Sequence, residues 1–157
     1  MSTYEIVPIS PERLDAMRVK DEDEFGNPWK PFPAEGWEPL RCCLRKAEPG
    51  EAVALICYTP WTEPSPWMEA GPVFVHAERC GGYPTPDRYP DDMARGKCMF
   101  NTFDHDGNRA YDHITFVSPG DSYEETLAEL LGRPEVAFVH VRSVAAGCLA
   151  FEARPAR

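Results

Sequence analysis

The sequence predicts an α+β fold, in which mainly antiparallel strands form a curled or barrel-like sheet with two short helices and long proline-rich loops. Apolar residues come in strand-sized runs, turn signals separate successive runs, and helical periodicity with capping residues occurs only twice. Successive hairpins favour antiparallel pairing with helices packed against the sheet. The 157 residues fit a single domain, expected over 1–157, that buries a sizeable core.

The two predicted helices each begin with a recognisable capping signal. Ser10 suits an N-cap, and Pro11 suits the first helical position because proline lacks the amide hydrogen that would be unpaired there. Ser122 with Glu125 three residues later indicates a capping box at the second helix. Gly132 is expected to end that helix.

Three hairpins account for most of the predicted strands. Residues 40–46 and 52–58 flank Glu48-Pro49-Gly50, a turn that is expected to pair them. In that register Leu44 lies near Val53. The other predicted strands are residues 4–9, 73–77, 98–103, 110–117, 136–141 and 148–153.

Two proline-rich stretches, residues 21–39 and 60–72, contain all four tryptophans. They are too apolar for free linkers. We expect them to fold over the sheet as ordered covers, and the alternative is an aromatic wall of a ligand pocket.

The net charge of −10 argues against non-specific binding to nucleic acid or to an anionic membrane surface. No apolar run approaches the length that crosses a bilayer, and the N-terminal residues lack a signal-peptide pattern, so a cytoplasmic location is expected. In a reducing compartment the six cysteines are expected as thiols or metal ligands. No Cys-x-x-Cys motif occurs, and most of these cysteines are expected to pack as small apolar side chains.

The tripeptide Phe-Val-His occurs twice in strand-like segments, ending at His76 and at His140. Alternate residues of a strand share a face, so His76 is expected on the face of Glu78, and His140 on the face of Arg142. If the two strands are neighbours, these four side chains converge.

Three interpretations of this histidine pair remain open at the level of sequence. The histidines are structural, or one of them works as a general acid or base, or they bind zinc or iron. Cys80 and Cys148 would complete a two-His, two-Cys set in the third case. The mixed charges beside the histidines favour a polar site over a metal cage, so no metal ligand is assigned and no cofactor is identified.

The segment Arg41-Cys42-Cys43-Leu44-Arg45 is a second candidate site. As a strand it would place Cys42 in the core and would put Arg41, Cys43 and Arg45 on the opposite face. Two guanidinium groups beside a thiol lower its pKa, which makes Cys43 the candidate reactive thiol. Alternatively the two arginines hold an anionic ligand or pair with carboxylates of the chain.

The phrases at residues 39–45, 49–51, 71–77, 139–142 and 147–148 resemble a bacterial family catalogued as domain of unknown function 1203. The family has members of about this length, so the resemblance covers nearly the whole chain. It implies a stand-alone bacterial protein and carries no activity that could be transferred.

Two functions from different classes are therefore predicted. In the first, the protein binds or acts on a small anionic molecule in a pocket lined by histidine, arginine and tryptophan. Its catalytic candidates are His76, His140 and Cys43, and its ligand-binding candidates are Arg41, Arg45, Arg142 and Glu78. In the second, the protein is a non-catalytic interaction or assembly module with structural histidines, which forms a homo-oligomer through its aromatic loops.

Overall fold

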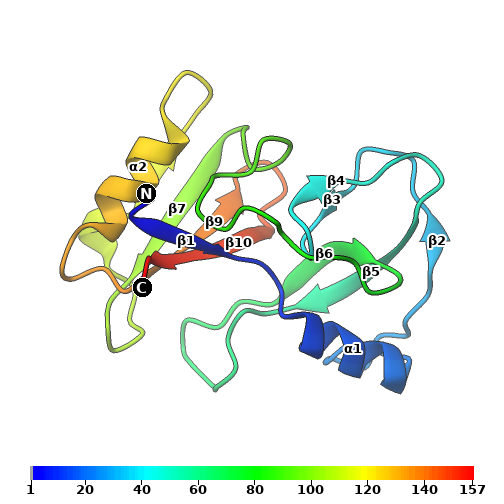
Figure 1. Cartoon of the computed structure of the whole chain (residues 1–157). Coiled ribbons are helices and arrows are strands. Elements are labelled where there is room, and N and C mark those ends of the chain that lie inside the picture. The colour runs from blue at the N-terminus through cyan, green and yellow to red at the C-terminus, as the bar shows by residue number, and fades with distance from the viewer. Residues whose placement is uncertain (1) are drawn as a thin grey trace. The chain divides into compact units, whose positions relative to one another are not determined.

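The computed structural model describes residues 2–157, which contain two α-helices and ten strands in two five-stranded sheets (Figure 1). The chain divides into two compact units. Unit 1 consists of residues 2–7 and 85–157, and unit 2 consists of residues 8–84. Each unit contains one sheet and one α-helix, and the predicted α+β class is confirmed.

The sheet of unit 1 has the strand order β1-β10-β9-β7-β8, and all of its neighbouring strands are antiparallel. The strands are β1 (Tyr4–Val7), β7 (Cys98–Phe103), β8 (Thr115–Val117), β9 (Phe138–Ser143) and β10 (Leu149–Pro155). The predicted hairpins at the β7–β8 and β9–β10 connections are confirmed. A short 3-10 helix, η1 (Tyr111–His113), precedes β8 and replaces the first half of the strand predicted at 110–117.

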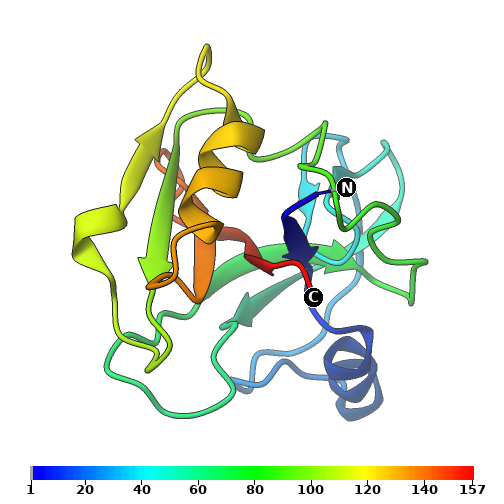
Figure 2. The ribbon, with the colours of Figure 1, turned by 60° about the vertical axis from the view of Figure 1, so that its left-hand side comes forward.

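Helix α2 (Tyr123–Leu131) covers one face of this sheet (Figures 1 and 2). The predicted capping box is confirmed at its start, because the Ser122 side chain accepts a hydrogen bond from the Glu125 amide. Leu127 is fully buried, as are Val139 and Val141 of the sheet. These apolar side chains form the core of unit 1.

The sheet of unit 2 has the order β2-β5-β6-β3-β4. The strands are β2 (Phe32–Pro33), β3 (Pro39–Leu40), β4 (Arg45–Lys46), β5 (Ala52–Tyr58) and β6 (Gly71–His76). Pairing is antiparallel except between β3 and β6, which run parallel. Helix α1 (Pro11–Lys20) begins at Pro11, as predicted, and buries Leu14 and Met17. The Ser10 hydroxyl donates to Glu12 instead of capping the helix.

The structure corrects the barrel-like alternative for the sheet and one predicted hairpin. The described residues form no closed barrel, because each five-stranded sheet remains open at two edge strands. The predicted hairpin between residues 40–46 and 52–58 is also not formed. Both edges of β5 are already paired, with β2 and with β6, so Val53 lies opposite Phe32 and His76 instead of Leu44.

Residues 41–44 form a tight turn between β3 and β4 in place of the predicted strand. The turn is closed by a hydrogen bond from the Leu44 amide to the Leu40 carbonyl, 2.8 Å long. Leu44, the last residue of this turn, has a φ of 58°, which is the left-handed conformation and not an extended one. The strand predicted from the residue pattern of this segment is therefore wrong for residues 41–44.

The loop that follows α1 packs only partly against the rest of unit 2. Trp29 is buried, and the Arg18 guanidinium lies 5.4 Å from the centre of its ring. Trp37 is instead 57% exposed and meets Phe74 edge-on. Neither helix of residues 2–157 is long and apolar enough to cross a membrane.

Candidate metal centre

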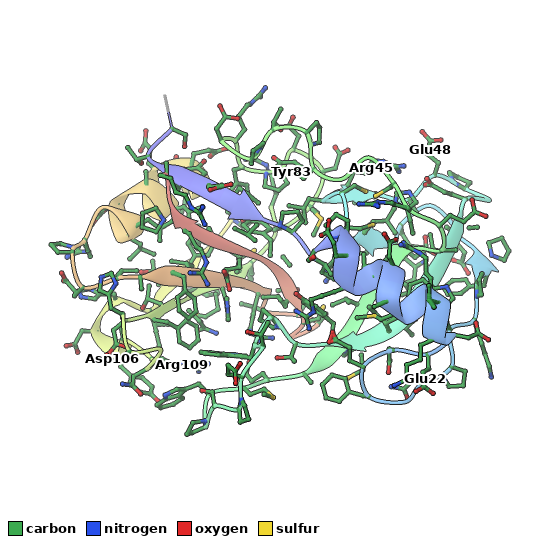
Figure 3. The ribbon with its side chains drawn as sticks, turned by 60° about the horizontal axis from the view of Figure 1, so that its bottom comes forward. Glu22, Arg45, Glu48, Tyr83, Asp106 and Arg109 are labelled. Carbon is green, nitrogen blue, oxygen red and sulfur yellow. The ribbon has the colours of Figure 1, made fainter. Side chains whose placement is uncertain are left out.

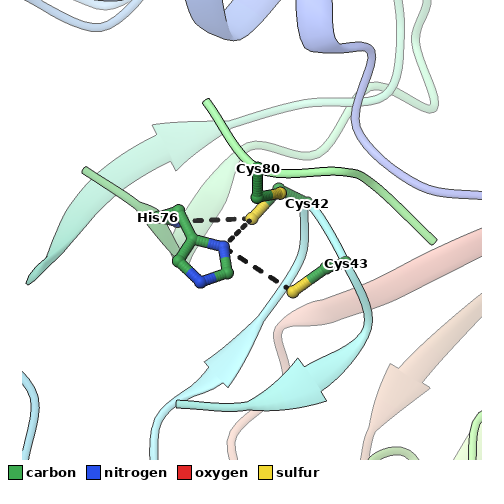
Figure 4. Close-up of side chains that lie close together, drawn as sticks. All are labelled: Cys42, Cys43, His76 and Cys80. Carbon is green, nitrogen blue, oxygen red and sulfur yellow. Dashed lines mark hydrogen bonds between the residues drawn. The ribbon is translucent and has the colours of Figure 1, made fainter. Parts of the chain in front are cut away.

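Three cysteines and one histidine of unit 2 gather at the end of β6 (Figure 4). Cys42 and Cys43 come from the turn after β3, His76 is the last residue of β6, and Cys80 follows four residues later. Their sulfur and nitrogen atoms all lie within 4.8 Å of one another. Cys42, Cys43 and His76 are buried, and Cys80 is half-buried.

The parallel pairing of β3 with β6 places this turn. Leu40 lies opposite Phe74, and the Arg41 amide donates to the Phe74 carbonyl over 2.8 Å. The chain then reverses at once, so both cysteines of the turn face the end of β6. In a strand, consecutive side chains would point to opposite faces and only one of the two would reach His76.

The Nδ1 atom of His76 faces the thiols. It lies 3.2 Å from Cys42 Sγ and 3.7 Å from Cys43 Sγ. The His76 backbone amide also donates to Cys42 Sγ over 3.3 Å. The thiols and one ring nitrogen thus surround a common point.

The other ring nitrogen of His76 is held by a carboxylate. Nε2 lies 2.6 Å from Glu51 Oε1, and Glu51 forms a two-pronged ion pair with Arg45, with distances of 2.7 and 3.1 Å. The Glu48 amide donates to the second carboxylate oxygen. Figure 3 marks Arg45 on β4 and Glu48 in the turn that follows it. Glu51 therefore fixes the ring orientation, and in the neutral ring it favours the tautomer with the proton on Nε2 and a lone pair on Nδ1.

The cluster shifts the pKa values of its own groups. Hydrogen bonding with Cys42 lowers the pKa of Cys80 to about 4 and that of Cys43 to about 6. The same hydrogen bonds raise the pKa of Cys42. Hydrogen bonding with Cys43 raises the pKa of His76 to about 9, and Arg45 lowers the pKa of Glu51 to about 2. The cluster therefore favours thiolate at Cys43 and Cys80, which is the form of cysteine that binds metals, and a metal ion would displace the protons of Cys42 and His76.

The structure brings together three of the predicted site residues, His76, Cys43 and Arg45. The predicted reason for a reactive Cys43 needs revision, since Cys42 and His76 lower its pKa. Arg41 is buried and donates to the Pro39 carbonyl, and Glu78 is exposed beyond the end of β6.

The second Phe-Val-His strand belongs to the other unit. His140 lies on β9 in unit 1, and β6 belongs to the other sheet, so the two strands do not pair with each other. His140 Nε2 lies 3.0 Å from Glu152 Oε2, and Arg142 donates to the Gly147 carbonyl. The two-His, two-Cys set considered from the sequence is represented in the cluster only by His76 and Cys80.

Sequence reasoning missed Cys42 and Glu51. A strand over residues 41–45 places Cys42 in the core, and strand parity gives no reason to pair Glu51 with His76. Two sequence signals could have indicated this site. They are the adjacent cysteine pair and the His76-x-x-x-Cys80 spacing, and all four of these residues lie in the cluster.

Comparisons with known proteins give a family without an activity. A family model described as "Protein of unknown function (DUF1203)" matches residues 37–154, well over half of the chain. All four residues of the cluster, and also Arg45 and Glu51, lie in the matched range. No curated protein and no solved structure matches the chain.

Proposed function

The chain belongs to the DUF1203 family, and we propose that it is a zinc-binding protein whose ligands are Cys42, Cys43, His76 and Cys80. The observation that carries this proposal is the convergence of four suitable ligand atoms within 4.8 Å. Three cysteines and one histidine form one of the standard ligand sets of structural zinc sites.

The spacing of the ligand atoms suits a tetrahedral ion. With Zn–S bonds of about 2.3 Å and Zn–N bonds of about 2.0 Å, the ligand atoms of a tetrahedral site lie roughly 3.5–3.8 Å apart. The two distances from His76 Nδ1 to sulfur, 3.2 and 3.7 Å, are close to this range.

The surroundings of His76 support the same proposal. A metal-bound histidine usually donates its second ring N–H to a carboxylate or carbonyl, and here Glu51 accepts at 2.6 Å. Thiolate ligands select zinc, copper(I) or iron–sulfur clusters over magnesium and calcium. Because all four positions are supplied by the protein, we propose a structural site that stabilises unit 2.

This proposal favours the non-catalytic alternative over the anionic pocket. The Arg45 guanidinium is engaged by Glu51, and the buried Arg41 binds the Pro39 carbonyl. Binding of a small anion by Arg41, Arg45, Arg142 and Glu78, and catalysis by His76, His140 or Cys43, stay predictions.

Elemental analysis tests the proposal directly. Protein purified without chelator, or reloaded with zinc after reduction, is expected to hold about one zinc ion per chain. The Cys42→Ser and Cys43→Ser variants should lose it. Cys98→Ser is the matched control, because Cys98 is a buried thiol of unit 1, and it should retain the ion. Cobalt(II) should give the intense visible bands of a tetrahedral thiolate complex.

Absence of stoichiometric metal from the reduced, zinc-reloaded protein contradicts the proposal. Stoichiometric iron in place of zinc corrects the metal and leaves the ligand set intact. Full retention of zinc by the Cys42 and Cys43 variants would place the ion elsewhere.

A further inference from the structure

We propose that the site is redox-regulated: a small hydroperoxide joins Cys42 and Cys80 in a reversible disulfide, and the metal is released. This inference rests on the proposed zinc site and adds a means of control to it. It is carried by the arrangement of the three thiols and by the access to two of them.

Two thiols of the cluster border a small pocket of unit 2. The pocket has a volume of about 10 Å³, and Cys42 and Cys80 line it together with Ile9, Leu14, Arg79 and Gly82. That volume holds about one water molecule, so a reactant that enters the pocket must be small, as hydrogen peroxide is. Cys80, the half-buried member of the cluster, is the first sulfur that such an oxidant meets.

The choice of disulfide partners follows from chain geometry. Cys42 and Cys43 are consecutive residues, and residues 2–157 contain no cis peptide bond, so their Cα atoms lie about 3.8 Å apart. Disulfides normally need Cα atoms about 4.4–6.8 Å apart, which disfavours a bond between these neighbours. Cys80 is therefore the partner of one of the two.

Cys42 is the better partner for Cys80. The sulfur atoms of Cys42 and Cys80 lie within 4.8 Å of each other. Both line the pocket, whereas Cys43 does not.

The chemistry balances with the peroxide as the only oxidant. The Cys80 thiolate attacks one peroxide oxygen, the O–O bond breaks, and a sulfenic acid and one water form after uptake of a proton. The Cys42 thiolate then attacks the sulfenic sulfur, the S–S bond forms, and hydroxide leaves and is protonated to water. Two thiolates, one hydrogen peroxide and two protons thus give one disulfide and two waters.

Oxidation removes two of the four zinc ligands. Cys43 and His76 remain, and two protein ligands are fewer than any stable structural zinc site uses. The ion leaves, and a thiol reductant with added zinc restores the original state.

Hydrogen peroxide added to the zinc-loaded protein tests this inference. We expect release of about one zinc ion per chain, followed with a chromogenic chelator, together with loss of about two titratable thiols. Mass spectrometry of the unreduced peptides should find the Cys42–Cys80 disulfide, and dithiothreitol with zinc should reverse both changes. Cys57→Ser, a half-buried thiol of unit 2 outside the cluster, is the matched control and should respond like the unaltered protein.

The outcomes separate this inference from the zinc proposal. Zinc that is bound stoichiometrically but survives an excess of peroxide overturns the redox inference alone. Zinc release with a disulfide between any other pair overturns the assignment of Cys42 and Cys80. A reduced protein that binds no zinc overturns both.

Discussion

The two Phe-Val-His strands offer a comparison within one chain. His76 ends β6 and His140 lies on β9, and both imidazoles are buried. Each presents Nε2 to a glutamate, at 2.6 Å from Glu51 and 3.0 Å from Glu152.

An arginine holds each glutamate in turn. Arg45 binds Glu51, and Arg154 binds Glu152. On one side of the ring the two histidines are thus nearly equivalent.

The two histidines differ in what surrounds the rest of the ring. His76 faces the thiols of Cys42 and Cys43, whereas His140 lies 4.8 Å from the Phe103 ring and 5.2 Å from the Phe138 ring. The thiols raise the pKa of His76 to about 9, and burial lowers the pKa of His140 in spite of its glutamate. A shared tripeptide with a shared His–Glu–Arg arrangement therefore yields a candidate ligand in one unit and a buried structural group in the other.

Removal of metal should produce the largest difference between the two strands. At free zinc about 1,000 times its Kd, binding stabilises the folded state by about 4 kcal/mol. A chelator should therefore speed hydrogen exchange of the β6 amides and of the 41–44 turn, and leave β9 unchanged. Equal acceleration in β6 and β9 would show that the ion does not act locally on unit 2.

Replacing each histidine should separate their roles. His76→Gln should weaken zinc binding by about 100-fold or more, because it removes a ligand, whereas loss of an outer partner costs about 10–100-fold. His140→Gln should leave the zinc affinity unchanged. Competition with a chelator of known affinity measures both variants, and a weaker zinc affinity in His140→Gln would assign His140 to the site.

The glutamates that hold the two histidines, Glu51 and Glu152, should also differ in their effect on zinc binding. Glu51→Gln should weaken zinc binding by about 10–100-fold, because the amide orients His76 less strongly than the carboxylate does. Glu48→Gln is the control, since Glu48 is an exposed residue of the neighbouring turn and should bind zinc normally. Glu152→Gln should leave zinc binding intact and lower the free energy of unfolding by about 1–2 kcal/mol, because Glu152 loses charged hydrogen bonds. Chelator competition and urea denaturation measure the two effects.

The pH dependence of stability should show the smallest effect. The pKa of folded His140 lies below its ordinary value of about 6.5, so the unfolded chain binds more protons than the folded chain as the pH falls below that value. His140 therefore removes stability as the pH falls from about 6.5 toward its folded pKa. Urea denaturation at pH values from 7 to 5.5 measures this effect. Over that range the free energy of unfolding should fall less in His140→Gln than in the unaltered protein. An unchanged slope would mean that other groups set the acid sensitivity in this range.

Local signals in the sequence predicted much of the fold. The capping box at Ser122, the proline at the start of α1, and the extents of β5 and β7 all come from short-range chemistry that the sequence displays directly. The partners of β5 were not predictable in this way. Its pairing with β2 and β6 depends on long-range contacts, and the turn signal at Glu48-Pro49-Gly50 favoured a different neighbour.

The candidate site was only half predictable for a related reason. Strand parity placed His76 and Cys43 at a polar surface but sent Cys42 to the core. The strand ends at Leu40, and the turn that follows it closes with a left-handed Leu44, a conformation that a leucine side chain does not predict. The turn lies next to the end of β6 because β3 pairs with β6 in parallel. That pairing joins residues far apart in the sequence, so local sequence patterns do not predict it.

The order of residues along the chain has a consequence for how the protein is made. Unit 2, with all four candidate ligands between positions 42 and 80, interrupts unit 1 in the sequence. Among residues 2–157, β1 pairs only with β10, whose partner residues begin at Glu152. At a synthesis rate of about 5–20 residues per second, Glu152 emerges some 4–14 seconds after Cys80. A ribosome therefore completes the whole ligand set while the first strand of the chain still awaits its partner.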